Sequence, residues 1–148
     1  MKKPIIIGVY GKSNSGKTML ISKIIRDLIK ENNKISTVKI TDKNVSIDTI
    51  GKDTWRHHEA GSNLVVLQSP KETDIIIKKQ LSENQIYDFI KVLGIYDIII
   101  VEGSRDESIP KIKVGDIIEI RKNTILSFNN NYDEIIHRIK NMINTRGV

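Results

Sequence analysis

The chain has 148 residues, of which 39% are hydrophobic and 28% charged, enough for one compact domain with its own core. It contains no cysteine, so disulfides, thiolate metal sites and cysteine nucleophiles are excluded. No apolar run approaches the roughly eighteen residues of a membrane-spanning helix, and we expect a cytoplasmic protein without a membrane span. The net charge of +6 favours an anionic partner. Because the basic residues are spread along the chain, a phosphate-rich small ligand explains this charge better than nucleic acid.

The first part of the chain alternates between strand and helix patterns. Pro4–Tyr10 is a short, nearly continuous apolar run, typical of a buried parallel strand. We do not interpret it as a signal peptide, because it lacks a small-residue cleavage site. After a glycine-rich turn, apolar residues recur at helical spacing until Asn32–Asn33, and Ile35–Ile40 is predicted to form a second strand. These elements make a strand–helix–strand unit with a right-handed crossover.

The remainder of the chain continues this alternation. A short helix is predicted over Asp53–Ala60, with Asp53 as its cap and Gly61 at its end. Further helices are predicted over Ser82–Leu93 and Tyr132–Ile143. Further strands or edge segments are predicted at Leu64–Leu67, Asp74–Lys78, Asp97–Val101, Ile112–Val114, Asp116–Ile120 and Ile125–Phe128. We therefore expect a single α/β domain over residues 1–148, with three layers, a mostly parallel central sheet and helices on both faces.

Residues 11–18 fit the phosphate-loop pattern G-x-x-x-x-G-K-S/T. Its glycines let the backbone curl so that N–H groups face phosphate oxygens, and the following helix presents its positive end to the same anion. Lys17 is expected to reach the β- and γ-phosphates, and the Thr18 hydroxyl to bind magnesium. A glycine-rich turn without a ligand is the alternative, but the pattern follows a predicted strand and opens a predicted helix. The predicted nucleotide-binding residues are Gly11, Lys12, Ser13, Asn14, Ser15, Gly16, Lys17, Thr18 and Met19.

Lys12 has a second interpretation. Some dimeric P-loop ATPases place a lysine directly after the first glycine and extend it across the dimer. Their loops usually continue with two glycines, whereas this chain has Ser13 and Asn14. We therefore favour a solvated or phosphate-adjacent lysine, with the cross-dimer role as the alternative.

A second candidate for magnesium binding lies at the end of the predicted strand Asp97–Val101. P-loop folds often place an acid at the end of an apolar strand beside the first one, where it binds magnesium directly or through water. Glu102 occupies this position, and Gly103 allows close approach of the backbone. Asp97 is assigned to a turn at the opposite end of the strand. The sequence thus pairs Glu102 with Thr18 as metal ligands.

Two arginines are candidates for contacts with phosphate or with a partner. Arg56 lies in the polar segment 53–61, which otherwise reads as a solvated helix with Trp55 packed against the domain. Arg105 follows Glu102 closely and is either a phosphate clamp or a surface residue. The adjacent His57 and His58 point in different directions on a helix and make a poor metal pair. The guanine-reading pattern Asn-Lys-x-Asp is missing, so the residues do not choose between GTP and ATP.

The sequence resembles the MobB family of molybdopterin-guanine dinucleotide biosynthesis adaptor proteins over nearly its whole length. The resemblance rests on IIIGVYGKSNSGKTMLISKII, IDTIGKDTWRHHEAGS and YDIIIVEGSRDESIPKIKV, in this order. It implies a homodimer that binds GTP and Mg²⁺, has at most weak GTPase activity, and assists a MobA-type nucleotidyltransferase in attaching GMP to molybdopterin. It also implies that Gly11, Gly16, Lys17 and Thr18 hold the triphosphate and the metal. Glu102 matches the acid of the family's VEG segment.

Two segments depart from the family pattern. Residues 39–43 stand where family members commonly have a Lys-His pair and further histidines, and Phe128–Asn130 stands where the last strand often ends in Thr-Asp. The alternative function is a P-loop kinase that phosphorylates a small metabolite with ATP, for which Asp42 or Asp48 would be the catalytic base. A nucleic-acid-binding P-loop protein is a third hypothesis, supported only by the positive charge.

Overall fold

The computed structural model describes residues 2–147, which divide into two compact units. The first unit combines residues 2–41 with residues 83–147 and contains the predicted phosphate loop. The second unit is the segment 42–82. No helix in residues 2–147 is long and apolar enough to cross a membrane. That the whole chain forms a single domain stays a prediction.

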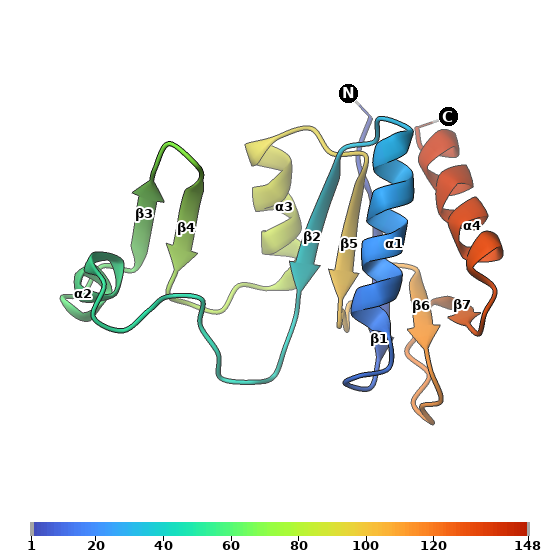
Figure 1. The fold of residues 1–148 in the computed structure, drawn as a ribbon, viewed down its shortest axis with the longest axis horizontal. Coiled ribbons are helices and arrows are strands. Elements are labelled where there is room, and N and C mark those ends of the chain that lie inside the picture. Colours follow the sequence, from blue (N-terminus) through green and yellow to red (C-terminus); the bar gives the residue numbers. More distant parts are fainter. Residues whose placement is uncertain (1, 148) are drawn as a thin grey trace. The chain divides into compact units, whose positions relative to one another are not determined.

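The first unit is built on a five-stranded sheet in which all neighbouring strands run parallel, in the order β2-β5-β1-β6-β7 (Figure 1). Parallel strands place their carboxyl ends at one edge, so the loops that follow them gather there. The strands are β1 (Ile5–Gly11), β2 (Ile35–Lys39), β5 (Ile98–Glu102), β6 (Lys111–Val114) and β7 (Thr124–Phe128). The helices are α1 (Lys17–Lys30), α3 (Glu83–Leu93) and α4 (Tyr132–Thr145).

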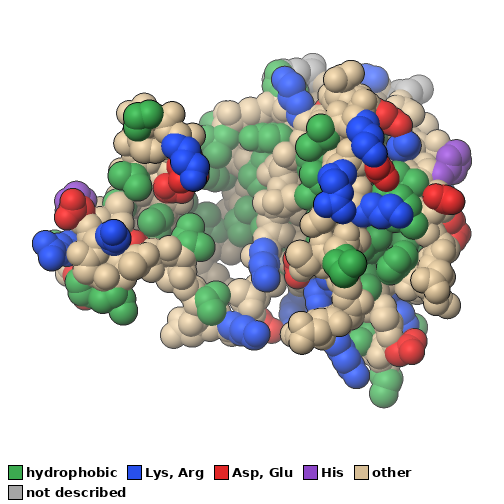
Figure 2. Space-filling view, in the orientation of Figure 1, with side chains coloured by type: hydrophobic (Ala, Val, Ile, Leu, Met, Phe, Trp, Pro, Cys, Tyr) green, Lys and Arg blue, Asp and Glu red, His purple; other side chains and the backbone are tan. Residues whose placement is uncertain are grey.

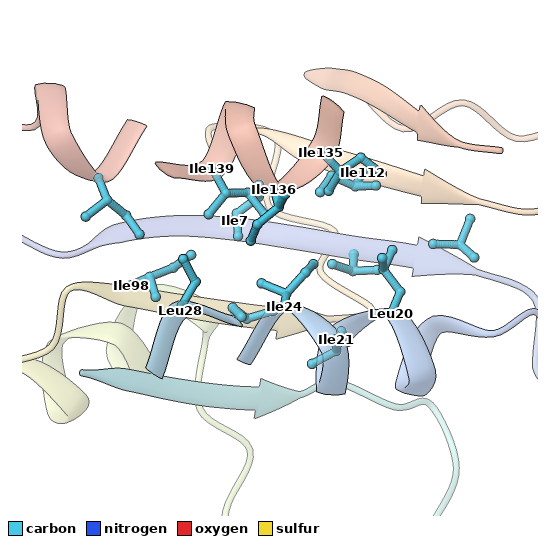
Figure 3. Close-up of a cluster of buried hydrophobic side chains, with 14 residues drawn as sticks. Ile7, Leu20, Ile21, Ile24, Leu28, Ile98, Ile112, Ile135, Ile136 and Ile139 are labelled. Carbon is cyan, nitrogen blue, oxygen red and sulfur yellow. The ribbon is translucent and has the colours of Figure 1, made fainter. Parts of the chain in front are cut away.

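Helices cover both faces of this sheet, because the strand side chains alternate between two hydrophobic clusters. Ile98 and Ile100 of β5 face the cluster formed with α1 and α4, which Figure 3 shows from close by. Ile99 and Val101 face the opposite cluster, to which α3 contributes Tyr87. The predicted three-layer α/β fold is therefore confirmed.

The second unit contains α2 (Asp53–Glu59) and an antiparallel pair, β3 (Leu64–Gln68) with β4 (Thr73–Ile77). The two predicted strands exist, but they form their own two-stranded sheet outside the central one. Within this unit Asp48 accepts a hydrogen bond from the Thr54 hydroxyl (2.9 Å) and pairs with the Lys78 ammonium (3.0 Å). Val65 is the only hydrophobic side chain of residues 42–82 that is fully buried.

Two sequence predictions of local structure are wrong. Asp116–Ile120 is a loop, because Gly115 adopts a φ of 74° and turns the chain at the end of β6. Ile118 and Ile120 of that loop are exposed, so the apolar pattern reflects no burial. Lys52 rather than Asp53 is the N-cap of α2: Lys52 has extended backbone angles, and Asp53 already lies in the first turn.

Candidate functional site

The connection from β1 to α1 forms the loop that the sequence predicts, and two glycines determine its path. A Cβ atom on Gly11 would lie 2.3 Å from the carbonyl oxygen of Val114, so β1 and β6 approach too closely for any side chain there. Gly16 has a φ of 93° and serves as the N-cap of α1, while Asn14 has a φ of 59°. Left-handed geometry at two loop positions is typical of backbone that directs successive N–H groups to one side.

The start of α1 has the features of an anion-binding site. Gly16 provides no side-chain cap, and the first turn contains no acidic residue, so the helix dipole and its first N–H groups are uncompensated by side chains. The buried Ser15 hydroxyl has no hydrogen-bond partner among residues 2–147. The Lys17 ammonium donates to the carbonyl oxygens of Gly11 (3.0 Å) and Lys12 (2.5 Å), which holds its charge over the loop. These groups fit a nucleotide's phosphates.

Glu102 lies at the carboxyl end of β5, opposite Val9 of β1 and Lys39 of β2. Because side chains alternate along a strand, Glu102 is on the same face as Ile98 and Ile100, the face that α1 covers. Its carboxylate and the Thr18 hydroxyl therefore belong to the same edge and the same side of the sheet. Both are oxygen ligands, and magnesium bound with a nucleotide needs only one or two protein ligands besides water and phosphate oxygens.

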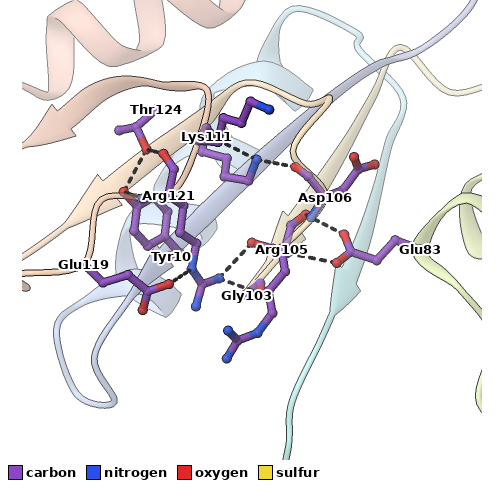
Figure 4. A network of polar contacts seen from close by, with 11 residues as sticks. Tyr10, Glu83, Gly103, Arg105, Asp106, Lys111, Glu119, Arg121 and Thr124 are labelled. Atoms are coloured by element: carbon purple, nitrogen blue, oxygen red, sulfur yellow. Dashed lines mark hydrogen bonds and ion pairs between the residues drawn. The ribbon is translucent and has the colours of Figure 1, made fainter.

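The segment directly after Glu102 is held from two sides, as Figure 4 shows. On one side, the Arg121 guanidinium donates to the carbonyl oxygens of Gly103 (2.9 Å) and Ser104 (2.8 Å). On the other side, the Glu83 carboxylate accepts hydrogen bonds from the Ser104 hydroxyl (2.5 Å) and the Arg105 N–H (2.9 Å). Sequence reasoning missed both Arg121 and Glu83. The only available signal was the acid at the start of a predicted helix.

The Glu83 carboxylate is partly buried, and its hydrogen bonds determine its protonation. Burial raises the pKa of Glu83, but the bonds from Ser104, Tyr87 and Arg105 outweigh burial and hold this pKa below its usual value. Burial and the bond to Glu83 raise the pKa of Tyr87.

The buried Lys111 has a structural role near this segment. Burial lowers the pKa of Lys111, whose ammonium donates to three backbone carbonyls, including that of Ile109 (3.0 Å). The Lys111 ammonium therefore holds the loop between β5 and β6 in place.

A groove of about 480 Å³ runs beside the start of α1. Its wall includes Thr18 and Met19 on α1, with Phe128 and Tyr132 at the ends of β7 and α4. The Lys23 ammonium lies 3.8 Å from the centre of the Tyr132 ring, a cation–π contact. Figure 2 shows Lys and Arg side chains over α1, where Lys23, Arg26 and Lys30 are exposed. An aromatic wall with cations at its rim suits a flat ring attached to phosphates.

The phosphate or partner contacts predicted for Arg105 and Arg56 stay predictions. Arg105 is three residues beyond Glu102, with an exposed side chain. Arg56 is exposed on α2 in the second unit, so its phosphate contact stays a prediction. The His58 ring bonds the Ser62 carbonyl at 3.1 Å, a local structural role. No group of three or more His, Cys, Asp or Glu with the arrangement of a metal site occurs in residues 2–147.

Comparison with known sequences points to one family. The family model described as Molybdopterin guanine dinucleotide synthesis protein B (MobB) matches residues 6–137. A molybdopterin-guanine dinucleotide biosynthesis adapter protein of Haemophilus influenzae is 36% identical over 110 residues, covering 72% of this chain and 61% of that protein. A putative adapter of the same description from Methanocaldococcus jannaschii is 32% identical over 144 residues, covering 88% of this chain and 58% of that protein. This chain thus spans about three fifths of these curated relatives.

Solved structures agree on the fold. MobB of Bacillus subtilis superposes with a TM-score of 0.69 at 17% identity, covering 90% of this chain and 97% of that one. A MobB homolog from Bacillus stearothermophilus gives 0.67 at 18% identity, with coverages of 95% and 99%. The sequence relatives and the match of the family model over residues 6–137 together establish the relationship: this chain belongs to the MobB family.

Proposed function

We propose that this protein is a nucleotide-binding adaptor in molybdenum cofactor biosynthesis, and that it binds Mg²⁺–GTP at residues 11–19. The observation that carries the proposal is the start of α1, which has no side-chain cap and no acid in its first turn. The Lys17 ammonium is already held over the loop by the carbonyls of Gly11 and Lys12. The named role of the curated relatives, adapters in molybdopterin-guanine dinucleotide biosynthesis, supports the pathway.

Each residue of the loop has a distinct task in this proposal. The backbone N–H groups between Gly11 and Thr18 donate to phosphate oxygens, as does the Ser15 hydroxyl that has no partner in residues 2–147. The Lys17 ammonium exchanges its two carbonyl partners for phosphate oxygens. The Thr18 hydroxyl and the Glu102 carboxylate hold the magnesium ion, directly or through water. The bound ion supplies positive charge that balances the phosphates.

The groove beside α1 provides a place for the base and ribose. Thr18 and Met19 lie where a phosphate chain leaves the loop, and the partly exposed ring of Phe128 offers a surface for stacking. The exposed amides of Asn129 and Asn130, directly after β7, offer donors and acceptors for the edge of a base. Preference for guanine is taken from the family, because these asparagines replace the Thr-Asp pattern that often ends this strand.

The adaptor role means that the protein works through others, and we propose a MobA-type nucleotidyltransferase and molybdopterin as partners of a homodimer. Hydrolysis is expected to be slow at most. Arg121, which approaches the end of β5, already donates to the carbonyls of Gly103 and Ser104. Because it also stacks on Tyr10, on the sheet face opposite α1, it is not placed to stabilise charge on a transferring phosphate.

The test is calorimetric titration of GTP and ATP, each with Mg²⁺, into the wild type and two single-lysine variants. We expect the wild type to bind GTP selectively and Lys17→Ala to lose about a hundredfold or more in affinity, the order expected when a charged group over phosphates is removed. Lys12→Ala, in the same loop, is the matched control and should lose much less. Tighter binding of ATP with phosphoryl transfer to a metabolite would instead support the kinase.

A further inference from the structure

Arg121 lies between β6 and β7, yet its side chain is joined to the strand that carries Glu102. One guanidinium nitrogen, Nη1, donates to two consecutive carbonyl oxygens, those of Gly103 at 2.9 Å and Ser104 at 2.8 Å. Only 16% of the Arg121 side chain is exposed, so these charged hydrogen bonds are largely shielded from water. A guanidinium buried to this extent needs hydrogen-bond partners, and here they include these two backbone carbonyls.

The guanidinium is itself fixed by Tyr10, which borders the phosphate loop, and by Glu119. It lies 4.9 Å from the centre of the Tyr10 ring, and its Nε donates to Glu119 at 3.3 Å. The Arg121 backbone N–H donates to the Tyr10 hydroxyl at 3.0 Å, and this hydroxyl also bonds the Thr124 hydroxyl at 2.7 Å. Tyr10 is buried and directly precedes Gly11. Arg121 therefore connects the residue before the phosphate loop with the two residues after Glu102 (Figure 4).

The backbone around Glu102 has little freedom once Arg121 is in place. The Glu102 carbonyl accepts from the Ile40 N–H at 2.8 Å, and the Gly103 N–H donates to the Val9 carbonyl at 2.8 Å. Gly103 has a φ of 87°, and a Cβ atom there would lie 2.5 Å from the Ile40 oxygen. β1 and β2 thus hold the chain up to Gly103, and Arg121 holds the next two carbonyls. The direction of the Glu102 side chain depends on this whole turn.

We propose that Arg121 is a positioning residue: it orients the Glu102 carboxylate toward the magnesium ion by holding the Gly103 and Ser104 carbonyls. This inference rests on the proposed function, since it concerns the metal that accompanies the nucleotide. The geometry separates it from a direct phosphate contact. Tyr10, against which Arg121 stacks, alternates with Val9 and so lies on the sheet face opposite α1, whereas Glu102 shares the α1 side.

The experiment measures GTP affinity twice for each variant, once with Mg²⁺ and once with EDTA. The dissociation constant in EDTA divided by the dissociation constant with Mg²⁺ gives the contribution of magnesium. For Arg121→Gln we expect this ratio to fall about tenfold, the order expected when charged hydrogen bonds are lost, while affinity in EDTA stays within about twofold. Arg121→Lys keeps the charge but not the two-carbonyl geometry and should recover part of the ratio. Binding of Mn²⁺ with GTP, followed by electron paramagnetic resonance, should weaken in parallel.

Lys122→Gln is the matched control, because it removes a neighbouring positive charge whose ammonium pairs with the exposed Glu107 (2.8 Å). It should leave the ratio unchanged. If Arg121→Gln does not fold, Tyr10→Phe tests the same link by removing the hydroxyl that accepts the Arg121 N–H, and it should lower the ratio by a smaller factor.

Three outcomes would overturn the inference. An unchanged ratio in Arg121→Gln means that Glu102 does not depend on Arg121. Equal losses with and without Mg²⁺ indicate a direct phosphate contact or a general structural role. A wild type that binds GTP equally well in EDTA contradicts the magnesium site of the proposed function as well, which distinguishes that failure from the first two.

Discussion

The two units of this chain differ in how they are held together. The first unit has two buried hydrophobic clusters, one on each face of a five-stranded sheet. In the second unit Val65 is the only fully buried hydrophobic residue, and most of the side chains of its two-stranded sheet are exposed. A unit with so little buried apolar surface depends on local polar contacts, such as the Asp48–Lys78 ion pair.

The difference matters because the candidate site belongs entirely to the well-packed unit. The predicted phosphate loop begins at the end of β1, and Glu102 lies at the end of β5. The buried residues of these two strands include Val9 and Val101. Binding groups that must keep a fixed geometry are best placed on rigid elements. The second unit, which contains Arg56 and the exposed Leu64 and Val66, has few buried contacts to hold such a geometry.

The largest expected effect is on the free energy of unfolding, compared between a buried position in the first unit and an exposed one in the second unit. Ile100→Ala removes a fully buried side chain from the first unit and should lower the free energy of unfolding by about 3 kcal/mol. Val66→Ala, at a side chain 55% exposed in the second unit, should cost less than about 0.5 kcal/mol. Urea unfolding followed by far-UV circular dichroism measures both. Similar losses of unfolding free energy in the two variants would contradict the difference in packing between the two units.

Trp55 offers a separate probe for the second unit, because it is the only tryptophan of the chain and lies in α2. Its fluorescence should change at a lower urea concentration than the circular dichroism signal, since the second unit has the smaller core. Coincident transitions would mean that the two units unfold as one.

The second effect concerns glycines with different surroundings. At Gly11, a Cβ would lie 2.3 Å from the Val114 oxygen, so Gly11→Ala must push β1 and β6 apart and should cost about 2 kcal/mol. At Gly51, in the second unit, the φ of 87° is strained for alanine but nothing lies within 4 Å, so Gly51→Ala should cost about 1 kcal/mol. Thermal unfolding compares them. Only Gly11→Ala should also lose GTP binding, and retention of that binding would argue against the loop's proposed path around the phosphates.

The sequence predicts those parts of the candidate site whose signals are local. The expectation of a phosphate loop follows from the residue types at Gly11, Gly16 and Lys17, because each is required within eight positions of chain, and phosphate binding there stays a prediction. Glu102 follows from one apolar strand that ends in an acid. The helices and most strands follow from hydrophobic periodicity, which burial in the first unit imposes directly.

The contacts that sequence reasoning missed join residues without a local pattern. Arg121 reaches Gly103 across eighteen positions, and Glu83 reaches Arg105 across twenty-two. No periodicity reports such pairs, because their spacing depends on the order of strands in the sheet. The apolar alternation in Asp116–Ile120 was misleading for a related reason: it resembles a half-buried strand, but the positive φ of Gly115 turns the chain there. Strand propensity likewise does not reveal that β3 and β4 pair only with each other in a separate two-stranded sheet.

The smallest effect is on pH dependence, where each unit has an acid that can be tested against its own probe. The pKa of Glu83 is held low because hydrogen bonds to its carboxylate outweigh burial, and the pKa of Asp48 is lowered chiefly by its bond from Lys78. A depressed pKa contributes stability above the unfolded-state value, about 4.3 for Glu and about 3.9 for Asp, and this contribution is lost as the pH falls through the folded-state pKa. Glu83→Gln should therefore flatten the acid loss of stability followed by circular dichroism, and Asp48→Asn the loss followed by Trp55 fluorescence. A variant that changed the other unit's probe would show that the two units do not titrate as separate structures. A variant that changed neither probe would show that its carboxylate does not contribute to stability through a lowered pKa.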